Sequence, residues 1–373
     1  MIPSVVEKLQ SGRASVRIVC FGDSITGVYF HTGGQRAWCD MLGIALQRIY
    51  PRAKIEMFNA GLSGNSTIEG LARMEKDVSV HQPHLVVVMF GMNDCKYGGK
   101  PEEFGENLEK IVQRSREIGA EVILCTPNSI YPQDQLRVPY LAGFAEIVRK
   151  TAARMAVPLV DCYRVYEDLR AVSPTEWMLL MSETVHPAMH GHKLFAEVIA
   201  ETITDRRISL VDVPPFSPSL DFTLRRIRQK QPVSMIAMPP YDKIMADALC
   251  NCFPDARIDV TTWSVAGVSL KAIEAWAKDV RDKKPNLVVI AVPSEAKAAT
   301  EEEFIRSYNE MLNWSLAPGN PEWDVVVIVP AGEDLARRVI LGKDIGYIEL
   351  PKGDISASGA VVARWVQEQD KDE

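Results

Sequence analysis

The chain lacks the features of a disulfide-bonded or membrane-inserted protein. Its seven cysteines are odd in number and scattered, and no CxxC pair occurs, so neither a disulfide framework nor a zinc site is indicated. The N-terminus has no long apolar core, and no apolar run reaches the length that crosses a bilayer. If Met1 is the natural start, we expect a cytoplasmic protein that is not inserted in a membrane.

An excess of positive charge is also missing. The net charge is -7, which argues against nucleic acid as a partner. The one basic run, Arg225 to Lys230, is better explained as a linker or a solvated helix face. With 373 residues, of which 47% are hydrophobic and 24% charged, the composition is that of a globular protein with two domains.

In the first half, short runs rich in Val and Ile alternate with longer segments that have the apolar spacing of helices. This alternation predicts a parallel sheet with helices on both faces. The predicted strands are 16–21, 54–59, 85–90, 121–126 and 157–160, and the predicted helices are 38–50, 104–118, 140–155 and 193–204. Ligands of such sheets bind at the carboxyl ends of the strands, so we expect the loops after the first three strands to meet at one site.

Residues 208–231 are rich in proline and lack a helical period, which predicts a linker between domains 1–207 and 232–373. Across this segment the sequence repeats itself. The run YPRAKIE from Tyr50 recurs as FPDARID from Phe253, Gly64 matches Gly267, and PHLVVV from Pro83 matches PNLVVI from Pro285. The matches keep their order and nearly constant spacing, so we interpret the chain as two copies of one α/β unit.

A serine follows the first predicted strand, in the run Gly22-Asp23-Ser24. Gly and Asp at the end of a strand permit a sharp turn that lifts the next side chain out of the sheet. A hydroxyl at that place can act as a nucleophile if a base lies beside it. The GxSxG elbow of α/β-hydrolases is absent around Ser24, which argues against that fold.

The next two loops offer hydrogen-bond donors. Gly64 lies in a glycine-containing loop that can turn a backbone N–H inward, and Asn93 carries a side-chain amide in the run Gly91-Met92-Asn93-Asp94. With the N–H of Ser24, these groups form a candidate oxyanion hole.

A base and its orienting group are found before the last predicted helix of the first half. His186 precedes Pro187, a residue suited to the first turn of a helix. Glu183 lies three residues earlier and can reach the second imidazole nitrogen, which is the orienting role in a serine triad.

These four elements resemble the SGNH-hydrolase (GDSL esterase/lipase) superfamily over about residues 15–205, with its Ser, Gly, Asn and His blocks at Ser24, Gly64, Asn93 and His186. The resemblance implies a flavodoxin-like three-layer α/β/α sandwich with a parallel sheet. It also implies hydrolysis of carboxylic esters or thioesters through an acyl-serine, without a metal or other cofactor. The family usually has Asp where this chain has Glu183, so either Glu183 completes a triad or a Ser24–His186 dyad operates.

The second copy lacks this constellation. Tyr241 stands roughly in the place of Ser24 and Glu295 in that of Asn93, and no histidine follows His192. Only Gly267 remains of the set. We therefore predict a degenerate, catalytically inactive domain that serves packing, dimer-like pairing or substrate contact. A homo-oligomer is a separate prediction.

The predicted partner is a small-molecule ester, with a short acyl group such as acetyl, because no long apolar lid is visible. Candidate substrate-binding residues flank the predicted site: Asp23, Tyr29, His31, Arg36 and Asp94. Three alternatives stay open: a metal cluster of Glu183, His186, His190 and His192, an acyl- or glycan-binding protein without turnover, and acyl transfer to an acceptor other than water.

Overall fold

The structure is a computed structural model that describes residues 2–265, 267–293, 296–319, 321–351 and 355–370. By its internal contacts the chain divides into two compact units. The first comprises Met1–Tyr29 and Arg36–Val213, and the second comprises Phe30–Gln35 and Pro214–Glu373.

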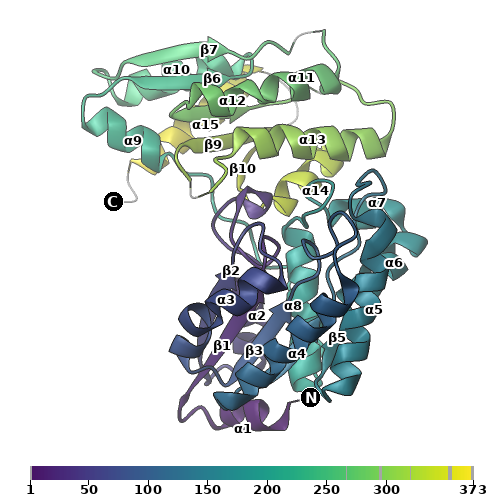
Figure 1. Cartoon of the computed structure of the whole chain (residues 1–373). Helices are drawn as coiled ribbons and strands as arrows, with labels where there is room; N and C mark the ends of the chain where they lie inside the picture. The colour runs from purple at the N-terminus through teal and green to yellow at the C-terminus, as the bar shows by residue number, and fades with distance from the viewer. Residues whose placement is uncertain (1, 266, 294–295, 320, 352–354, 371–373) are drawn as a thin grey trace. The chain divides into compact units, whose positions relative to one another are not determined.

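The first unit is built on a five-stranded parallel sheet (Figure 1). Its strands are β1 (Ser15–Gly22), β2 (Lys54–Gly61), β3 (Leu85–Met89), β4 (Glu121–Cys125) and β5 (Leu159–Val160). The spatial order is β2-β1-β3-β4-β5, which is the flavodoxin-like order of doubly wound sheets. Every residue of β3 is buried, as expected of a central strand covered on both faces. The predicted fold class is confirmed.

Two groups of helices pack with this sheet. In one group α2 (Trp38–Ile49) and α1 (Pro3–Ser11) contact α8 (Met189–Thr204), and in the other α4 (Pro101–Glu117) contacts both α3 (Thr67–Asp77) and α5 (Val138–Arg154). The remaining short elements are α6 (Cys162–Val172), α7 (Pro174–Leu179) and the 3₁₀ turns η1 (Phe30–Thr32) and η2 (Ser79–His81), of which η1 groups with the second unit.

The second unit has a sheet of the same topology. Its strands are β6 (Val233–Ala237), β7 (Ile258–Thr262), β8 (Leu287–Ile290), β9 (Asp324–Pro330) and β10 (Tyr347–Leu350), in the order β10-β9-β8-β6-β7. Its helices are α9 (Asp221–Arg228), α10 (Tyr241–Cys252), α11 (Leu270–Ala277), α12 (Asp279–Lys283), α13 (Glu301–Ser315), α14 (Asp334–Gly342) and α15 (Ile355–Gln369).

Matched residues of the sequence repeat make the same contacts in the two units. The N–H of Tyr50 closes α2 on Leu46 O, and the N–H of Phe253 closes α10 on Leu249 O, each at 2.8 Å. Shortly before β3 and β8, the N–H groups of His84 and Asn286 donate at 2.8 Å to Arg17 O and Ser234 O, respectively. This correspondence is consistent with a tandem duplication.

The predicted linker differs from the structure. From Pro214 onward the chain groups with the second unit, and the supposedly aperiodic segment contains α9. The carboxylate of Asp324 accepts the N–H groups of Phe222 and Thr223 at 3.2 and 2.7 Å. A carboxylate from a distant strand thus satisfies the donors at the start of α9, and no local sequence pattern reveals that partner.

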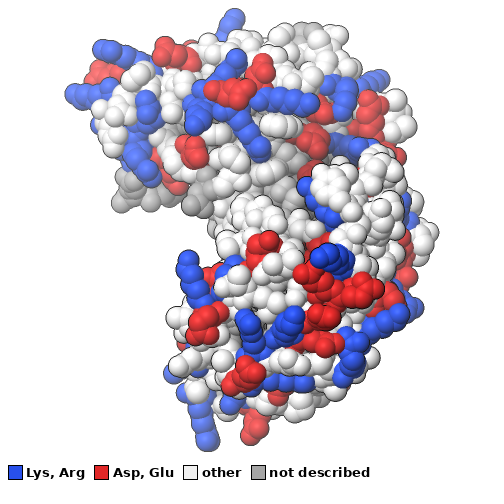
Figure 2. All heavy atoms as spheres, viewed as in Figure 1, with Lys and Arg blue, Asp and Glu red and all other residues white. Residues whose placement is uncertain are grey.

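The surface and the helices add two observations. On the face drawn in Figure 2, acidic and basic side chains occur together on each unit. Among the described residues, no helix combines the length and apolarity needed to cross a bilayer.

Candidate active site

Ser24 stands on a tight turn at the carboxyl end of β1. The N–H groups of Thr26 and Gly27 donate to Asp23 O at 3.2 and 3.0 Å, and the N–H of Ile25 donates to Asp23 Oδ1 at 2.9 Å. A Cβ on Gly22 would lie 2.5 Å from Met89 O, so only glycine fits there. From residue 22 to 27, every residue is buried except Ser24, which leaves its hydroxyl accessible.

His186 meets Ser24 from a segment 162 residues further along the chain. The distance from Ser24 Oγ to His186 Nε2 is 2.8 Å. His186 lies in a loop closed by an antiparallel bridge between Met181 and Pro187, within which Ser182 N–H donates to His186 O at 2.8 Å. Helix α8 begins only at Met189, so the expected start of the helix at Pro187 is wrong; Pro187 pairs with Met181 instead.

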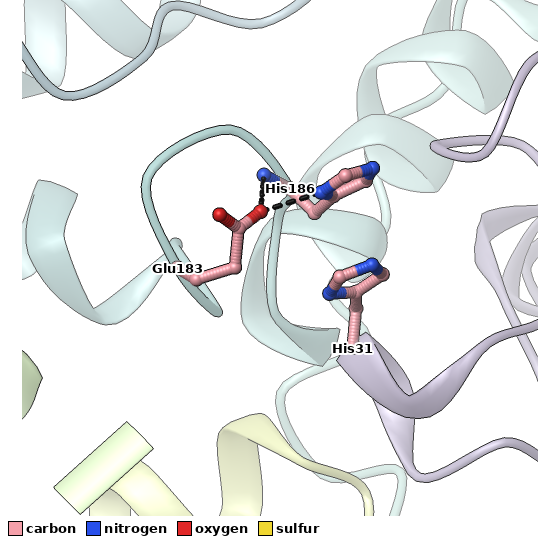
Figure 3. A group of neighbouring side chains, drawn as sticks. All are labelled: His31, Glu183 and His186. Carbon is pink, nitrogen blue, oxygen red and sulfur yellow. Dashed lines mark hydrogen bonds and ion pairs between the residues drawn. The ribbon is translucent and has the colours of Figure 1, made fainter. Parts of the chain in front are cut away.

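Glu183 holds the opposite edge of the same imidazole. Its Oε1 lies 2.5 Å from His186 Nδ1 and accepts the backbone N–H of His186 at 2.6 Å (Figure 3). The same oxygen accepts the backbone N–H of Val185 at 3.2 Å. The extra methylene of Glu, compared with Asp, is accommodated because the loop curls back over the carboxylate. Glu183 therefore does not point away from the imidazole, as the dyad alternative would require.

The ionisation of Glu183 fixes the tautomer of His186. Burial by itself would raise the pKa of this carboxyl, but its hydrogen bonds from His186 and Val185 outweigh burial and lower the pKa. The carboxylate is thus ionised at neutral pH and can only accept hydrogen bonds. The imidazole proton must then reside on Nδ1, which leaves the Nε2 lone pair facing the hydroxyl of Ser24.

The second and third loops bring donors to the same end of the sheet. Gly64 has φ +76°, a conformation that favours glycine. Within the described part of the chain, the N–H groups of Ser24 and Gly64 make no backbone hydrogen bond. The amide of Asn93 donates to Asn65 O at 3.0 Å, which ties the two loops together and leaves the second amide hydrogen for another acceptor.

Two of the predicted substrate-binding residues have structural roles instead. The side chain of Asp94 accepts the N–H of Thr67 at 2.9 Å and that of Gly91 at 3.2 Å, so it caps α3 and closes its own loop. Asp23 is 1% exposed, and its Oδ1 is occupied by Ile25. Both carboxylates thus shape the turns beside the site, and substrate contact by them stays a prediction.

The other three predicted substrate-binding residues follow the nucleophile. The hydroxyl of Tyr29 accepts the N–H of Ser63 at 2.9 Å, so Tyr29 lies against the second loop. Arg36 is half-buried just before α2. His31, also drawn in Figure 3, stands on η1 within the segment that groups with the second unit.

Arg73 of α3 joins these loops by hydrogen bonds, and no sequence pattern predicts this role. Its guanidinium donates to Gly22 O at 2.7 Å, Ala60 O at 2.9 Å and Asn65 Oδ1 at 2.7 Å, and its side chain is 11% exposed. It thereby joins the end of the nucleophile strand to the second loop. A lone arginine on a predicted helix face carries no signal for such a role.

The proposed His/Glu metal cluster is not assembled. His192 is 2% exposed, its Nδ1 accepts the N–H of Trp38 at 2.9 Å, and burial lowers its pKa to about 3. The ring of His192 serves the start of α2 and is not free to bind a metal together with Glu183 and His186.

The chain is similar to known esterases. The family model of the GDSL-like lipase/acylhydrolase family matches residues 20–194. An arylesterase of Vibrio mimicus is 27% identical over 52% of this chain and 90% of its own length, and an acetylxylan esterase of Geobacillus stearothermophilus is 28% identical over 42% and 76%. The crystal structure of Axe2, an acetylxylan esterase from Geobacillus stearothermophilus, is 26% identical over 50% of this chain and 94% of that chain, with a TM-score of 0.44.

The N-terminal half of the chain is therefore a carboxylic ester hydrolase domain. Over residues 20–194 this half is similar to the GDSL-like lipase/acylhydrolase family, which supports the SGNH superfamily that its four blocks predict. The family match ends at residue 194 and includes, of the second unit, only the segment Phe30–Gln35.

Proposed function

We propose that the first unit hydrolyses carboxylic esters through an acyl-serine formed on Ser24. The observation that carries the proposal is the 2.8 Å contact between Ser24 Oγ and His186 Nε2, because a serine hydroxyl is a competent nucleophile only when a base can take its proton. Glu183 on the far side of the ring supports it, since it holds the tautomer that can act as that base.

The reaction then follows from these positions. His186 Nε2 accepts the proton of Ser24 as Oγ attacks the acyl carbonyl, and Glu183 stabilises the imidazolium that forms. The N–H groups of Ser24 and Gly64 and the amide of Asn93 donate to the oxyanion. His186 next protonates the leaving alcohol, and it later activates the water that releases the acid.

We propose a short acyl group, such as acetyl, for the substrate. The chain is similar to an acetylxylan esterase and to an arylesterase, but also to the thioesterase 1/protease 1/lysophospholipase L1 of Escherichia coli at 26% identity over 51% of this chain and 84% of that protein. Their names span different acyl and leaving groups. A series of p-nitrophenyl esters from acetate to octanoate tests the proposal: kcat/KM should fall as the chain lengthens, and a rise would contradict it.

The nucleophile is tested separately with Ser24→Ala. Hydrolysis of p-nitrophenyl acetate should be lost, as should covalent labelling by a fluorophosphonate, because the phosphonate needs an activated hydroxyl. Retained activity or labelling in Ser24→Ala would overturn the assignment. Labelling of the unaltered protein also separates an enzyme from an ester-binding protein without turnover.

A further inference from the structure

The base loop, which we define as Met181–Pro187, carries both Glu183 and His186 and is part of no helix or sheet. Its ends pair with each other through the bridge between Met181 and Pro187. Figure 3 shows the chain from Glu183 to His186 as a loop. The position of the imidazole therefore depends on the hydrogen bonds within this loop and on contacts that reach it from outside.

Two such contacts come from the loop after β4. They reach the two residues that separate the orienting carboxylate from the base. The N–H of Tyr131 donates to Thr184 O at 3.0 Å, and the amide of Asn128 donates to Val185 O at 3.0 Å. One neighbouring segment thus holds both carbonyl groups between the carboxylate and the imidazole. A shift of either carbonyl would change how these two groups face each other.

The side chain of Asn128 is connected to the chain only through its donors, as far as the described residues show. It is fully buried, and its Nδ2 also donates to Ser129 O at 2.9 Å. Both neighbours of the nitrogen are carbonyl oxygens, so the amide nitrogen and not its oxygen must face them. Oδ1 has no hydrogen-bond partner among the described residues. An apolar side chain of similar size at this position would therefore remove these two donated bonds and nothing else.

The segment that carries Asn128 is itself well packed. Ser129 and Tyr131 are both buried. The indole of Trp177 donates to Ser129 Oγ at 3.1 Å, and its ring meets that of Tyr131 edge-on with centroids 4.7 Å apart. The contacts to the base loop thus come from a part of the fold that is fixed by its own packing.

The same segment reaches the oxyanion loop, Gly91–Asp94, further along the chain. The guanidinium of Arg137 donates to Met92 O at 3.0 Å, and Met92 directly precedes Asn93. Arg137 is held in turn by an ion pair with Asp134 at 2.7 Å, in which the two side chains are 13% and 8% exposed. Residues 128–137 therefore contact the base loop with one end and the oxyanion loop with the other.

We infer that residues 128–137, which we call the alignment segment, position the catalytic base and the oxyanion amide relative to each other. Asn128 and Arg137 are its positioning residues, and they act through the backbone of the base loop and of the oxyanion loop, respectively. This role rests on the proposed function, because it serves the acyl-serine reaction. Small displacements of reacting groups cost much of the rate, so loss of either contact should lower turnover more than substrate binding.

The first test compares Asn128→Leu with Ser115→Ala. Ser115 is also fully buried and also donates to a backbone carbonyl, Ile111 O at 2.8 Å. It lies in the last turn of α4, shortly before β4 begins, and so away from the carboxyl ends of the strands. For p-nitrophenyl acetate, Asn128→Leu should lower kcat about 10- to 100-fold and leave KM within about twofold, because no substrate contact is removed. Ser115→Ala should lower Tm but not kcat.

An unchanged kcat in Asn128→Leu would overturn the inference, as would an equal loss of kcat in folded Ser115→Ala. If the leucine variant is overpacked and does not fold, Asn128→Ala removes the same donors without added bulk and is judged in the same way.

A double-mutant cycle separates alignment of the base from a general loss of stability. Glu183→Gln disturbs the imidazole directly. Adding Asn128→Leu to that variant should therefore lower kcat by less than about threefold more, because the two changes act on one group and their effects do not multiply. Fully multiplied losses, measured where both proteins are folded, would show that Asn128 does not act through the base.

The other end of the alignment segment is tested with Arg137→Met and Arg137→Lys. The methionine variant cannot donate to Met92 O, and its kcat should fall about tenfold. The lysine variant keeps a donor and a cation for Asp134, and its kcat should return to within about threefold of the unaltered enzyme. In an Asn93→Ala background the effect of Arg137→Met should largely disappear. Equal losses in both Arg137 variants, or a loss that persists without Asn93, would contradict the role.

Fluorophosphonate labelling of Ser24 keeps this inference apart from the proposed function. Labelling should be slower in Asn128→Leu by about the factor found for kcat, and unchanged in Ser115→Ala. If the unaltered protein does not label, the acyl-serine proposal fails. If the unaltered protein labels and Asn128→Leu labels at the same rate, only the alignment role fails.

Discussion

Helices α3 and α11 occupy corresponding places in the two units and serve them differently. Both start at a serine whose side chain accepts a backbone N–H, Ser66 in α3 and Ser269 in α11. Seven residues further stand Arg73 in the first unit and Trp276 in the second. Arg73 ties together the loops that carry the site, whereas Trp276 stacks on the buried ring of Trp263 with centroids 4.9 Å apart.

The difference shows that the framework and the site are separable. Strand order, helix caps and loop glycines are common to the two units, and Gly64 and Gly267 even share a positive φ. At the position of Arg73 the first unit has polar contacts between the loops near Ser24, whereas at the matched position the second unit has aromatic packing. Glu295, the predicted counterpart of Asn93, lies outside the described residues, and the inactivity of the second unit stays a prediction.

The largest expected difference in kcat/KM is between a variant of His186 and a variant of the second unit. His186→Ala removes the base in contact with Ser24 and should lower kcat/KM for p-nitrophenyl acetate by roughly 10⁴–10⁶. Tyr241→Phe, at the position matched to Ser24, should leave kcat/KM unchanged. A comparable loss in Tyr241→Phe would show that the second unit takes part in the chemistry.

Glu183→Gln should follow, with kcat lower by roughly 10³–10⁴, because the amide no longer enforces a proton on His186 Nδ1. Glu183→Asp shortens the side chain and should retain activity within about tenfold, since the carboxylate is kept. Steady-state kinetics on one substrate, with matched Tm values, checks both. Full activity in Glu183→Gln would favour a dyad.

Asn93→Ala should cost about 10²–10³ in kcat, the usual effect of removing one oxyanion donor. The same change also removes the bond to Asn65 O. Asn93→Asp keeps the size of the side chain but cannot donate, so it removes both hydrogen bonds without leaving a cavity. Similar kcat losses in both variants would support the donor role. Near-normal kcat in Asn93→Asp would show that neither hydrogen bond of the amide is needed and would contradict the donor role.

Arg73→Met should lower kcat/KM about tenfold by releasing the loops that carry Ser24 and Gly64. Arg73→Lys can satisfy part of the carbonyl contacts and should lose less. Trp276→Leu, the matched change in the second unit, should lower Tm by several degrees with little effect on kcat. If Arg73→Met lowers Tm without lowering kcat/KM, the hydrogen bonds of Arg73 stabilise the fold and do not support the site.

The smallest effect concerns Asp23 and the pH dependence of stability. Burial raises its pKa from 3.8 to about 7, so the folded state binds a proton that the unfolded chain releases near pH 4. Stability is therefore lost as pH rises through this range. Asp23→Asn keeps an oxygen for the Ile25 N–H without the charge, and its Tm gain should be about 3 °C larger at pH 8 than at pH 5. Equal gains at both pH values would contradict this.

Much of the fold could be predicted from the sequence, and the predictions that failed have one cause. Strands of Val and Ile and helices of regular apolar spacing were placed within a few residues, because burial imposes those periods locally. Helix α9 and the segment Phe30–Gln35 were missed, since their positions depend on Asp324, Lys343 and Arg281, partners far away in the chain. The hydrogen bonds that Asp23 and Asp94 accept from nearby turns could not be predicted, because a carboxylate beside a nucleophile looks the same in sequence whether it faces substrate or caps a turn.

By itself, the sequence determined the parallel α/β class and its repeat, the family that the first half resembles, and which side chains could act as nucleophile, base and oxyanion donors. A cytoplasmic location, a homo-oligomer and the absence of nucleic-acid partners stay predictions. Only the tertiary structure decided that Ser24 Oγ and His186 Nε2 lie 2.8 Å apart and that Glu183 contacts the other nitrogen of the same imidazole. It also decided that the segment Phe30–Gln35 groups with the second unit. The physical reason is that strand and helix periods are local, whereas a hydrogen bond between residues 162 positions apart exists only once the sheet has brought its loops to one edge.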